Sequence, residues 1–180
     1  MRLSRGFTLF ELIAAMAVAA ILLGIALPAF SHARAAASAG SVRADLAATL
    51  IDAVRHASVT GTEVIVCPSG GSLQCSGQTL WDAGWMAYAD LDGDRSRDPG
   101  ETLVDQVHAI DQRVHLRSTR GRTKLVFQPN GSNAGSNVTF TLCDARGTDY
   151  AVTLVMSNAG VMRTGTPTAQ AAQDCMSGEG

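Results

Sequence analysis

The chain has 180 residues and carries a long apolar run close to its first residue. A short basic leader, residues 1–6, precedes this run, and from Phe7 to Phe30 the only ionisable side chain is Glu11. A helix of these 24 residues would be roughly 36 Å long at about 1.5 Å per residue, enough to cross a hydrocarbon core of about 30 Å with some tilt. The pattern therefore predicts a transmembrane helix over residues 7–30.

A second apolar pattern follows, with a helical period. Over residues 31–61 apolar side chains recur at three- and four-residue spacing, which is typical of an amphipathic helix with one buried stripe. Pro28 should kink the helix because proline removes a backbone donor, and Gly61 is suited to end it. We expect one helix from Phe7 to about Thr60, whose second half packs on a globular head. The stripe consists of Val42, Leu46, Leu50, Ala53, Val54 and Ala57.

After Gly61 the apolar period shortens to two, which is typical of β-strands. Turn signals such as Asn130-Gly131 separate the short runs. The tail from Thr164 is rich in Thr, Ala and Gln, and we expect it to be irregular. The predicted fold class is therefore α+β, with a long helix packed on a small antiparallel β-sheet head over residues 62–180. The expected strands cover residues 62–67, 84–90, 102–110, 114–117, 124–128, 137–143 and 150–156.

The residues around the start of the apolar run are not those of an ordinary secretory signal. Such a signal has a small-x-small cleavage site after its apolar segment, whereas Gly6 stands before the run. Residues 6–11, Gly-Phe-Thr-Leu-Phe-Glu, resemble the N-terminus of a type IV prepilin. This resemblance implies cleavage between Gly6 and Phe7 by a prepilin peptidase and N-methylation of Phe7. It also implies that Glu11 pairs with the N-terminal amine of a neighbouring subunit during assembly.

The physical chemistry of Glu11 agrees with that role. A carboxylate inside an apolar span costs about 2.5–3.5 kcal/mol on insertion scales, so it needs a partner. The alternative is a plain membrane anchor in which Glu11 reaches to the membrane interface.

Motifs along the head, taken in order, resemble the FimT/GspH family of minor pilins and pseudopilins. The resemblance covers essentially the whole chain and implies a helix with a β-rich head, low-abundance incorporation into a filament, and no catalysis. The motifs are Val64-Ile65-Val66-Cys67, Gly84-Trp85 before an Asp-containing loop, Phe127-Gln128-Pro129-Asn130-Gly131, Thr139-Phe140-Thr141-Leu142-Cys143 and Ser157-Asn158-Ala159-Gly160.

The resemblance leaves two filament systems open. The protein would be a minor type IV pilin that supports pilus assembly, twitching or DNA uptake, or a GspH-like pseudopilin of a type II secretion system. Its partners would be the prepilin peptidase and other pilins or pseudopilins. It would be a single-pass inner-membrane protein with its head in the periplasm, and later part of a pseudopilus or of a pilus at the cell surface.

Composition and motifs exclude several other classes. The formal net charge is −2, and removal of Arg2 and Arg5 with the leader leaves 12 basic residues against 16 acidic ones. Nucleic-acid binding would therefore need a local basic patch. The sequence has no Walker A, His-Glu-x-x-His, Gly-x-Ser-x-Gly or dinucleotide motif, so we expect no enzymatic activity and no cofactor other than calcium.

The local basic patch with the most charge lies in residues 113–124. On a strand, Arg113, His115 and Arg117 share one face, and such a cluster can neutralise phosphates without reading base sequence. Some FimT-like minor pilins are DNA receptors with a Gly-Arg-x-Arg motif near the C-terminus, which in this chain reads Gly160-Val161-Met162-Arg163 and lacks the first Arg. The alternative is an ordinary solvated strand face. The candidate residues for binding double-stranded DNA are Arg113, Arg117, Arg120, Arg122, Lys124 and Arg163.

The four cysteines predict two disulfides in a chain exported from the cytosol. Three pairings are open. Cys67 and Cys75 are separated by a short Gly- and Ser-rich segment that closes easily, which would leave Cys143 to pair with Cys175. A metal-thiolate site is disfavoured, because the sequence has no Cys-x-x-Cys pair.

Residues 90–101 form an acidic stretch with the ligand spacing of an EF-hand calcium loop. Position 6 of such a loop is normally Gly but here is Arg95, and the flanking segments are predicted strands rather than helices. The alternative is a solvated connection between two strands, with Arg95 and Arg97 neutralising the carboxylates. The candidate calcium ligands are Asp90, Asp92, Asp94, Asp98 and Glu101, with Ser96 at position 7.

Overall fold

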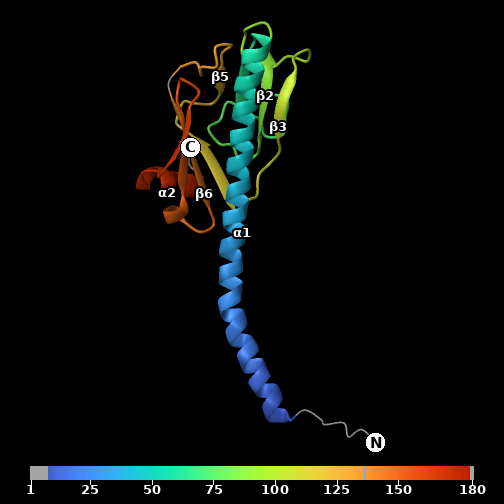
Figure 1. Ribbon diagram of the computed structural model, residues 1–180, viewed down its shortest axis with the longest axis vertical. Helices are drawn as coiled ribbons and strands as arrows, with labels where there is room; N and C mark the ends of the chain where they lie inside the picture. The colour runs from blue at the N-terminus through green and yellow to red at the C-terminus, as the bar shows by residue number, and fades with distance from the viewer. Residues whose placement is uncertain (1–7, 136, 179–180) are drawn as a thin grey trace, which may run out of the picture. The chain divides into compact units, whose positions relative to one another are not determined.

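The computed structural model describes residues 8–135 and 137–178 of the chain. The chain divides into two compact units, Met1–Arg34 and Ala35–Gly180. Helix α1 (Leu9–Thr60) contributes residues to both units (Figure 1). The expected cleavage site between Gly6 and Phe7 lies outside the described residues.

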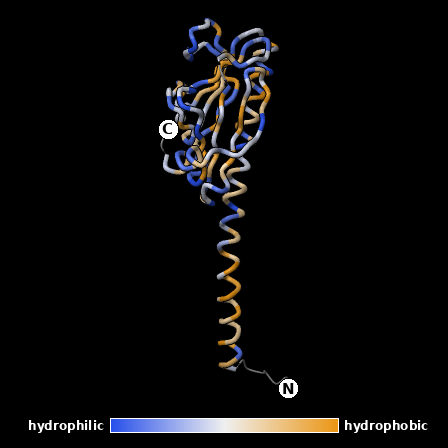
Figure 2. Tube along the Cα trace, turned by 90° about the vertical axis from the view of Figure 1, so that its left-hand side faces the viewer, coloured by the Kyte–Doolittle hydropathy of each residue, from blue (hydrophilic) through white to orange (hydrophobic). Residues whose placement is uncertain are grey.

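The described part of the first unit is almost entirely the apolar half of α1. Each residue from Leu9 to Arg34 is exposed, including large side chains such as Phe10, at 81%, and Phe30, at 69%. Figure 2 shows the apolar character of this half of the helix. By length and composition, α1 is able to cross a membrane. The helix continues through Pro28.

The second half of α1 buries one stripe of mostly small and branched apolar side chains, as its period predicts. The helix ends where Gly61 adopts a left-handed φ of 73° and donates its N–H to the carbonyl of Ala57 over 3.0 Å. Glycine is suited to this helix-terminating position because it lacks a Cβ. Val54, expected in the stripe, is only half-buried. The buried positions are Ala35, Ala39, Val42, Leu46, Thr49, Leu50, Ala53 and Ala57.

The rest of the second unit contains two four-stranded antiparallel sheets, with strand orders β3-β2-β1-β5 and β4-β6-β7-β8. The predicted α+β fold class is confirmed, with two sheets forming the head. The strands are β1 (Glu63–Pro68), β2 (Trp85–Asp90), β3 (Leu103–Val107), β4 (Val114–Ser118), β5 (Leu125–Phe127), β6 (Val138–Asp144), β7 (Val152–Met156) and β8 (Met162–Gly165).

The buried face of α1 and both sheets share one apolar core. In Figure 1 this part of α1 lies with β2 and β3 on one side and β5 and β6 on the other. Trp81 is fully buried in the core, with its ring centroid 5.0 Å from that of Phe140 in an edge-on arrangement. The indole N–H of Trp85, also fully buried, donates to the Thr49 hydroxyl of α1 over 3.0 Å. The polar atom of this tryptophan is therefore satisfied by the helix that it packs against.

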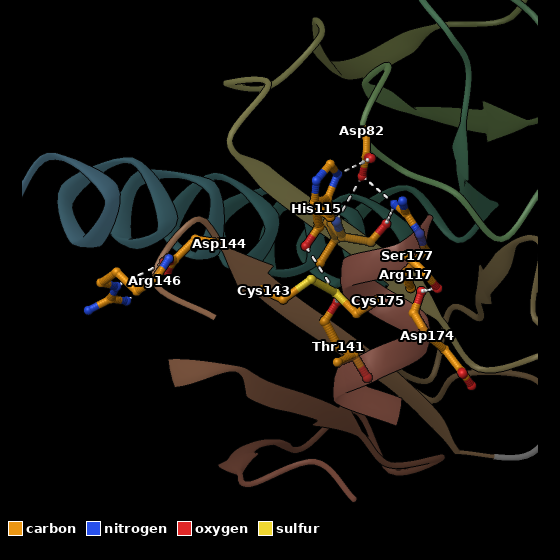
Figure 3. Close-up of a disulfide and its surroundings, with 11 residues drawn as sticks. Asp82, His115, Arg117, Thr141, Cys143, Asp144, Arg146, Asp174, Cys175 and Ser177 are labelled. Carbon is orange, nitrogen blue, oxygen red and sulfur yellow. Dashed lines mark hydrogen bonds and ion pairs between the residues drawn. A yellow bond between two sulfur atoms is a disulfide. The ribbon is translucent and has the colours of Figure 1, made fainter. Parts of the chain in front are cut away.

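A disulfide lies at each sheet. Cys67, on β1, pairs with Cys75 in the connection that follows. Cys143, on β6, pairs with Cys175 of helix α2 (Ala169–Ser177), so that α2 covers part of the second sheet (Figure 3). Because 32 positions separate Cys143 from Cys175 and 8 separate Cys67 from Cys75, a loop-closure model gives a few kcal/mol for each bridge and about 1 kcal/mol more for the second.

The tail is ordered, contrary to the expectation that it is irregular from Thr164. It forms the last residues of β8 and then α2. The Thr168 side chain caps α2 by accepting a hydrogen bond from the N–H of Ala171. Burial of Ala172 and Cys175 against the second sheet supplies the stabilisation that a nine-residue helix lacks by itself.

Replacement of Leu46 by Ala should lower the free energy of unfolding of the head by about 2–5 kcal/mol, because Leu46 is completely buried between α1 and the sheets. Equilibrium denaturation of the full chain in detergent, followed by the fluorescence of the two buried tryptophans, measures this. Ile51→Ala is the matched control, since Ile51 lies on the same helix and is 60% exposed. Equal losses in the two variants would contradict the burial of Leu46 in the core.

Candidate functional site

Glu11 lies in the first turn of α1, within its exposed apolar half. The Thr8 hydroxyl accepts a hydrogen bond from the backbone N–H of Glu11 over 3.3 Å, in the manner of an N-terminal cap. A carboxylate is favoured at this end of a helix because it complements the helix dipole. The side chain is exposed, so its oxygens are accessible to a cationic partner from outside the chain.

Two basic side chains of the expected DNA patch are instead engaged within the head. Arg113 donates from Nε to Oδ1 of Asp111 over 2.9 Å, and the Ser38 hydroxyl of α1 donates to Oδ2 of the same carboxylate over 2.8 Å. The hydrogen bonds from Arg113 hold the pKa of the Asp111 carboxyl well below its usual range. Arg113 therefore belongs to a contact between α1 and the turn before β4.

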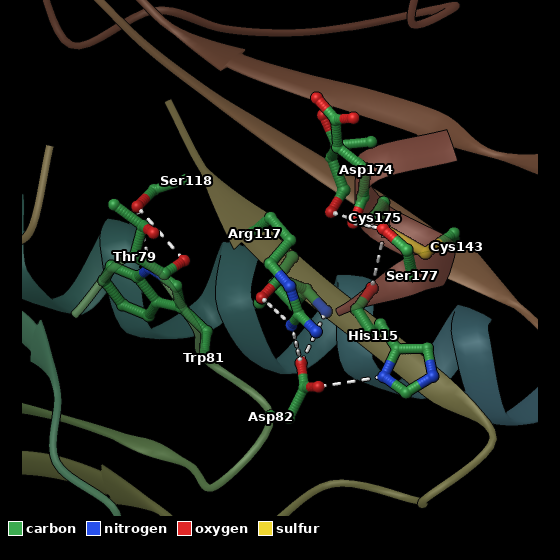
Figure 4. Close-up of polar contacts among 12 residues, drawn as sticks. Thr79, Trp81, Asp82, His115, Arg117, Ser118, Cys143, Asp174, Cys175 and Ser177 are labelled. Carbon is green, nitrogen blue, oxygen red and sulfur yellow. Dashed lines mark hydrogen bonds and ion pairs between the residues drawn. A yellow bond between two sulfur atoms is a disulfide. The ribbon is translucent and has the colours of Figure 1, made fainter. Parts of the chain in front are cut away.

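Arg117 is only 8% exposed and donates to the carboxylate of Asp82. Asp82 lies in the segment before β2, and it also accepts from the backbone N–H of Leu116 and is 2.8 Å from Nδ1 of His115 (Figure 4). The sequence correctly placed His115 and Arg117 on one strand face, but it contained no signal for the aspartate that meets them. This cluster ties the segment before β2 to β4.

The Asp82 carboxyl is held in its ionised form by these partners. Burial acts to raise its pKa, but the hydrogen bonds that it accepts, above all from Arg117, outweigh burial, and the pKa is lowered from its ordinary value of 3.8. A charge-assisted contact of this kind is stronger than a neutral hydrogen bond. The cluster therefore acts as a structural contact rather than as a site for an external phosphate.

Two of the remaining basic residues, Arg122 and Lys124, line shallow clefts. Arg120 is exposed, Arg122 donates to the carbonyl of Ala134, and Lys124 donates to the carbonyl of Arg95 over 2.9 Å. The clefts, of about 230 and 300 Å³, share Arg95, Thr123 and Lys124. Arg95 and Arg97 also line the smaller cleft. The alternative interpretation of the acidic loop had both side chains neutralising its carboxylates, but Arg95 pairs with Glu63 instead. Arg163, on β8, is exposed.

The five acidic side chains of the loop occupy two kinds of environment. Asp90 and Glu101 are buried at its two ends, whereas Asp92, Asp94 and Asp98 are exposed. One carboxylate oxygen from each of Asp90, Asp92 and Asp94 lies within 4.8 Å of the others. The structure places neither Asp98 nor Glu101 in this group.

The comparisons with known proteins agree with the fold and with the N-terminal helix. The family model described as "Type II transport protein GspH" matches residues 41–160, and the "Prokaryotic N-terminal methylation motif" matches residues 1–27. Pilin-like protein PilA1 of Thermus thermophilus is 29% identical over 134 residues, which cover 71% of this chain and 78% of that protein.

Solved structures of the type IV minor pilin FimU of Pseudomonas aeruginosa have a similar fold. Two crystal forms give TM-scores of 0.53 and 0.55 at 17% identity. They cover 74% and 78% of this chain, and 93% and 92% of the FimU chain.

An apolar helix with one carboxylate in its first turn, joined to a β-rich head, defines a type IV pilin-like protein. The chain belongs to the GspH family, whose model matches more than half of it. It is therefore a minor pilin or a pseudopilin, a structural subunit rather than an enzyme.

Replacement of Asp82 by Ala should lower the free energy of unfolding at pH 7 by about 2 kcal/mol, because it leaves the buried guanidinium of Arg117 without its carboxylate. The folded-state pKa of Asp82 is depressed, so its contribution is present above 3.8 and is lost as the pH falls through the folded value. The difference between wild type and variant should therefore shrink below pH 3.8. Denaturant titrations at several pH values measure this.

Asp45→Ala is the control for that experiment, since Asp45 is an exposed carboxylate on α1. A loss in Asp82→Ala that stays constant down to the lowest pH would contradict the role assigned to the ionised carboxylate.

Proposed function

We propose that the protein is a minor type IV pilin that is incorporated into a pilus and supports its assembly, twitching or DNA uptake. Prepilin peptidase cleaves it between Gly6 and Phe7 and methylates Phe7. The observation that carries the proposal is the exposed apolar half of α1, in which Glu11 is the only ionisable residue between Leu9 and Phe30. So large an apolar surface requires lipid or neighbouring helices to cover it. The match of residues 1–27 to the N-terminal methylation motif supports processing at this site.

The same helix anchors the subunit in the membrane before assembly and packs against other subunits during assembly. Before assembly it spans the inner membrane, with the head in the periplasm. Lipid tails are as apolar as the side chains of neighbouring helices, so moving the helix from lipid into a filament gains little from the hydrophobic effect. Close packing and polar contacts therefore decide whether the helix associates with other subunits. The small residues between positions 14 and 20 permit close packing. Glu11 supplies the polar contact by pairing with the N-terminal amine of a neighbouring subunit.

The alternative is a pseudopilin of a type II secretion system, which would use the same helix and head. The name of the matching family, Type II transport protein GspH, favours a pseudopilin in a short periplasmic filament of a type II secretion system. In that case the helix and Glu11 keep the same roles, and the head remains in the periplasm.

Deletion of the gene should impair twitching or natural transformation and leave secretion of an extracellular hydrolase unchanged, because only the pilus would lack a subunit. The three phenotypes are measured side by side in the deletion strain. Loss of secretion with normal twitching and transformation would assign the protein to a type II secretion system instead.

Complementation makes this experiment specific to the helix. Wild type and Asp45→Ala should restore the phenotype, whereas Glu11→Ala should leave the protein in the membrane and absent from sheared filaments, since its carboxylate no longer recruits a neighbour's amine. Normal incorporation of Glu11→Ala would remove Glu11 from the assembly mechanism.

A second proposal is that the head binds double-stranded DNA as a receptor for natural transformation. The observation in its favour is the basic surface around the two clefts, to which Arg95, Arg122 and Lys124 contribute, with exposed Arg120 on the same loop as Arg122. Because Arg113 and Arg117 are engaged with carboxylates of the head, the loop after β4 carries the binding in this proposal.

If this proposal holds, replacing Arg120, Arg122 and Lys124 together by Ala should weaken binding of duplex DNA to the full chain in detergent. The slope of log K against log salt should become shallower by about 2.7, because each phosphate that is no longer neutralised reduces it by roughly 0.9. Fluorescence anisotropy with a labelled duplex measures both. The control replaces Arg34, Arg43 and Arg55 by Ala. These residues are exposed on α1, and their replacement removes the same amount of positive charge. Equal weakening in both triple variants would contradict a localised DNA site.

A further inference from the structure

The connection between β2 and β3 is folded around carboxylates. Asp90, the last residue of β2, accepts backbone N–H groups of Gly93 and Arg95 at 3.0 and 3.1 Å, one on each oxygen. Glu101 accepts backbone N–H groups of Leu91 and Asp98 in the same way, at 2.8 and 3.0 Å. The two carboxylates thus fix both ends of the loop.

Arg95 resolves the first of the two departures from an EF-hand pattern. It is the only non-glycine residue with a positive φ among the described residues, at 62°. Position 6 of an EF-hand loop requires a sharp turn and is normally Gly. Here the chain makes a left-handed turn at the same position without glycine, and Asp90 at position 1 receives the N–H of that residue.

The exposed carboxylates of the loop converge on the buried one. Oxygens of Asp90, Asp92 and Asp94 lie within 4.8 Å of one another. Calcium binds oxygen at about 2.3–2.6 Å, so ligands on opposite sides of the ion are roughly 5 Å apart. The three oxygens are therefore already close enough to bind one ion.

The charge of this group is not compensated within the described part of the chain. Asp90 is 3% exposed and Glu101 is 7% exposed, and no described basic side chain forms an ion pair with either. Arg95 pairs with Glu63 outside the loop, at 3.5 Å, and Arg97 donates to the main-chain oxygen of Glu101 rather than to its carboxylate. Buried carboxylates without a counterion are costly.

Tyr88 provides an independent indication. It lies two residues before Asp90 and is fully buried, yet its hydroxyl has no hydrogen-bond partner. Residues two apart on a strand point to the same face, so the Tyr88 side chain lies on the same face of β2 as the Asp90 side chain. Buried polar groups without a partner are rare and often indicate an ion or a water.

We propose that the β2–β3 connection is a calcium site formed by the carboxylates of Asp90, Asp92 and Asp94, while Glu101 fixes the other end of the loop through the backbone. Magnesium is a poorer match because it requires a smaller octahedral shell and retains its waters. Bound calcium would fix the end of β2 to the start of β3. It would also hold Arg95, whose carbonyl accepts from Lys124, and so order one wall of the basic clefts. The calcium site would be the same in a type IV pilus and in a type II secretion system.

The test is titration of the full chain in detergent with Ca²⁺ after treatment with a chelator, followed by calorimetry. We expect one site with a Kd of about 10⁻⁴–10⁻³ M, as in extracellular calcium modules, and a higher Tm in Ca²⁺ than in chelator. Mg²⁺ at the same concentration should give at least tenfold weaker binding. Tb³⁺, excited through nearby aromatic side chains such as Tyr88, should luminesce when bound, and Ca²⁺ should displace it.

The variant Asp92→Asn with Asp94→Asn should lose at least tenfold in Ca²⁺ affinity and keep the Tm of the wild type in chelator, because both side chains are exposed. The control is Asp52→Asn with Asp149→Asn, which changes the net charge equally on α1 and on the turn before β7. No heat and no change in Tm in wild type at millimolar Ca²⁺ would overturn the proposal. Undiminished binding in the loop variant, or equal loss of affinity in the control, would also overturn it.

Discussion

The head depends on the packing of one face of α1, from Ala35 to Ala57, against two sheets at once. The sheets use different strands, and the buried face of the helix belongs to the apolar core that both sheets share. The face is built largely of Ala and Leu side chains that are buried in this core. The opposite side of this half of α1 stays polar, with Arg43 and Asp45 exposed, whereas the preceding half is apolar all round. One helix thus meets two different requirements along its length.

Buried polar contacts position the helix against the head more specifically than apolar packing alone. The Thr49 hydroxyl accepts from Trp85 and donates to Asp105 on β3, so one side chain of α1 is connected to two strands of the first sheet. Ser38, three turns earlier, reaches Asp111 before β4 in the second sheet. Because each of these bonds has a fixed length and direction, a rotation of α1 about its axis would break them. The helix therefore has a defined register on both sheets.

The sequence predicted those features that local pattern determines. The change of period after Gly61 located the end of α1 and the region of the strands, and the length of the first apolar run indicated a membrane span. Helix α2 was missed because its stability comes from Cys143 and Ala151, which are distant in sequence, rather than from its own polar composition. The contact between Arg117 and Asp82 was missed for the same reason, because the two residues are 35 positions apart in the sequence. The expected roles of Gly6, Phe7 and Glu11 came from family resemblance and remain predictions.

The disulfide between Cys143 and Cys175 has a consequence for biogenesis. Cys175 lies on α2, 32 positions after Cys143, which belongs to an inner strand of the second sheet. The bridge that fastens α2 can form only once the chain from β6 through α2 has reached an oxidising environment. A chain that stops short of α2 would carry a thiol on β6, on a sheet face without its cover. Thiol reactivity at Cys143 would therefore distinguish subunits that contain α2 from those that lack it.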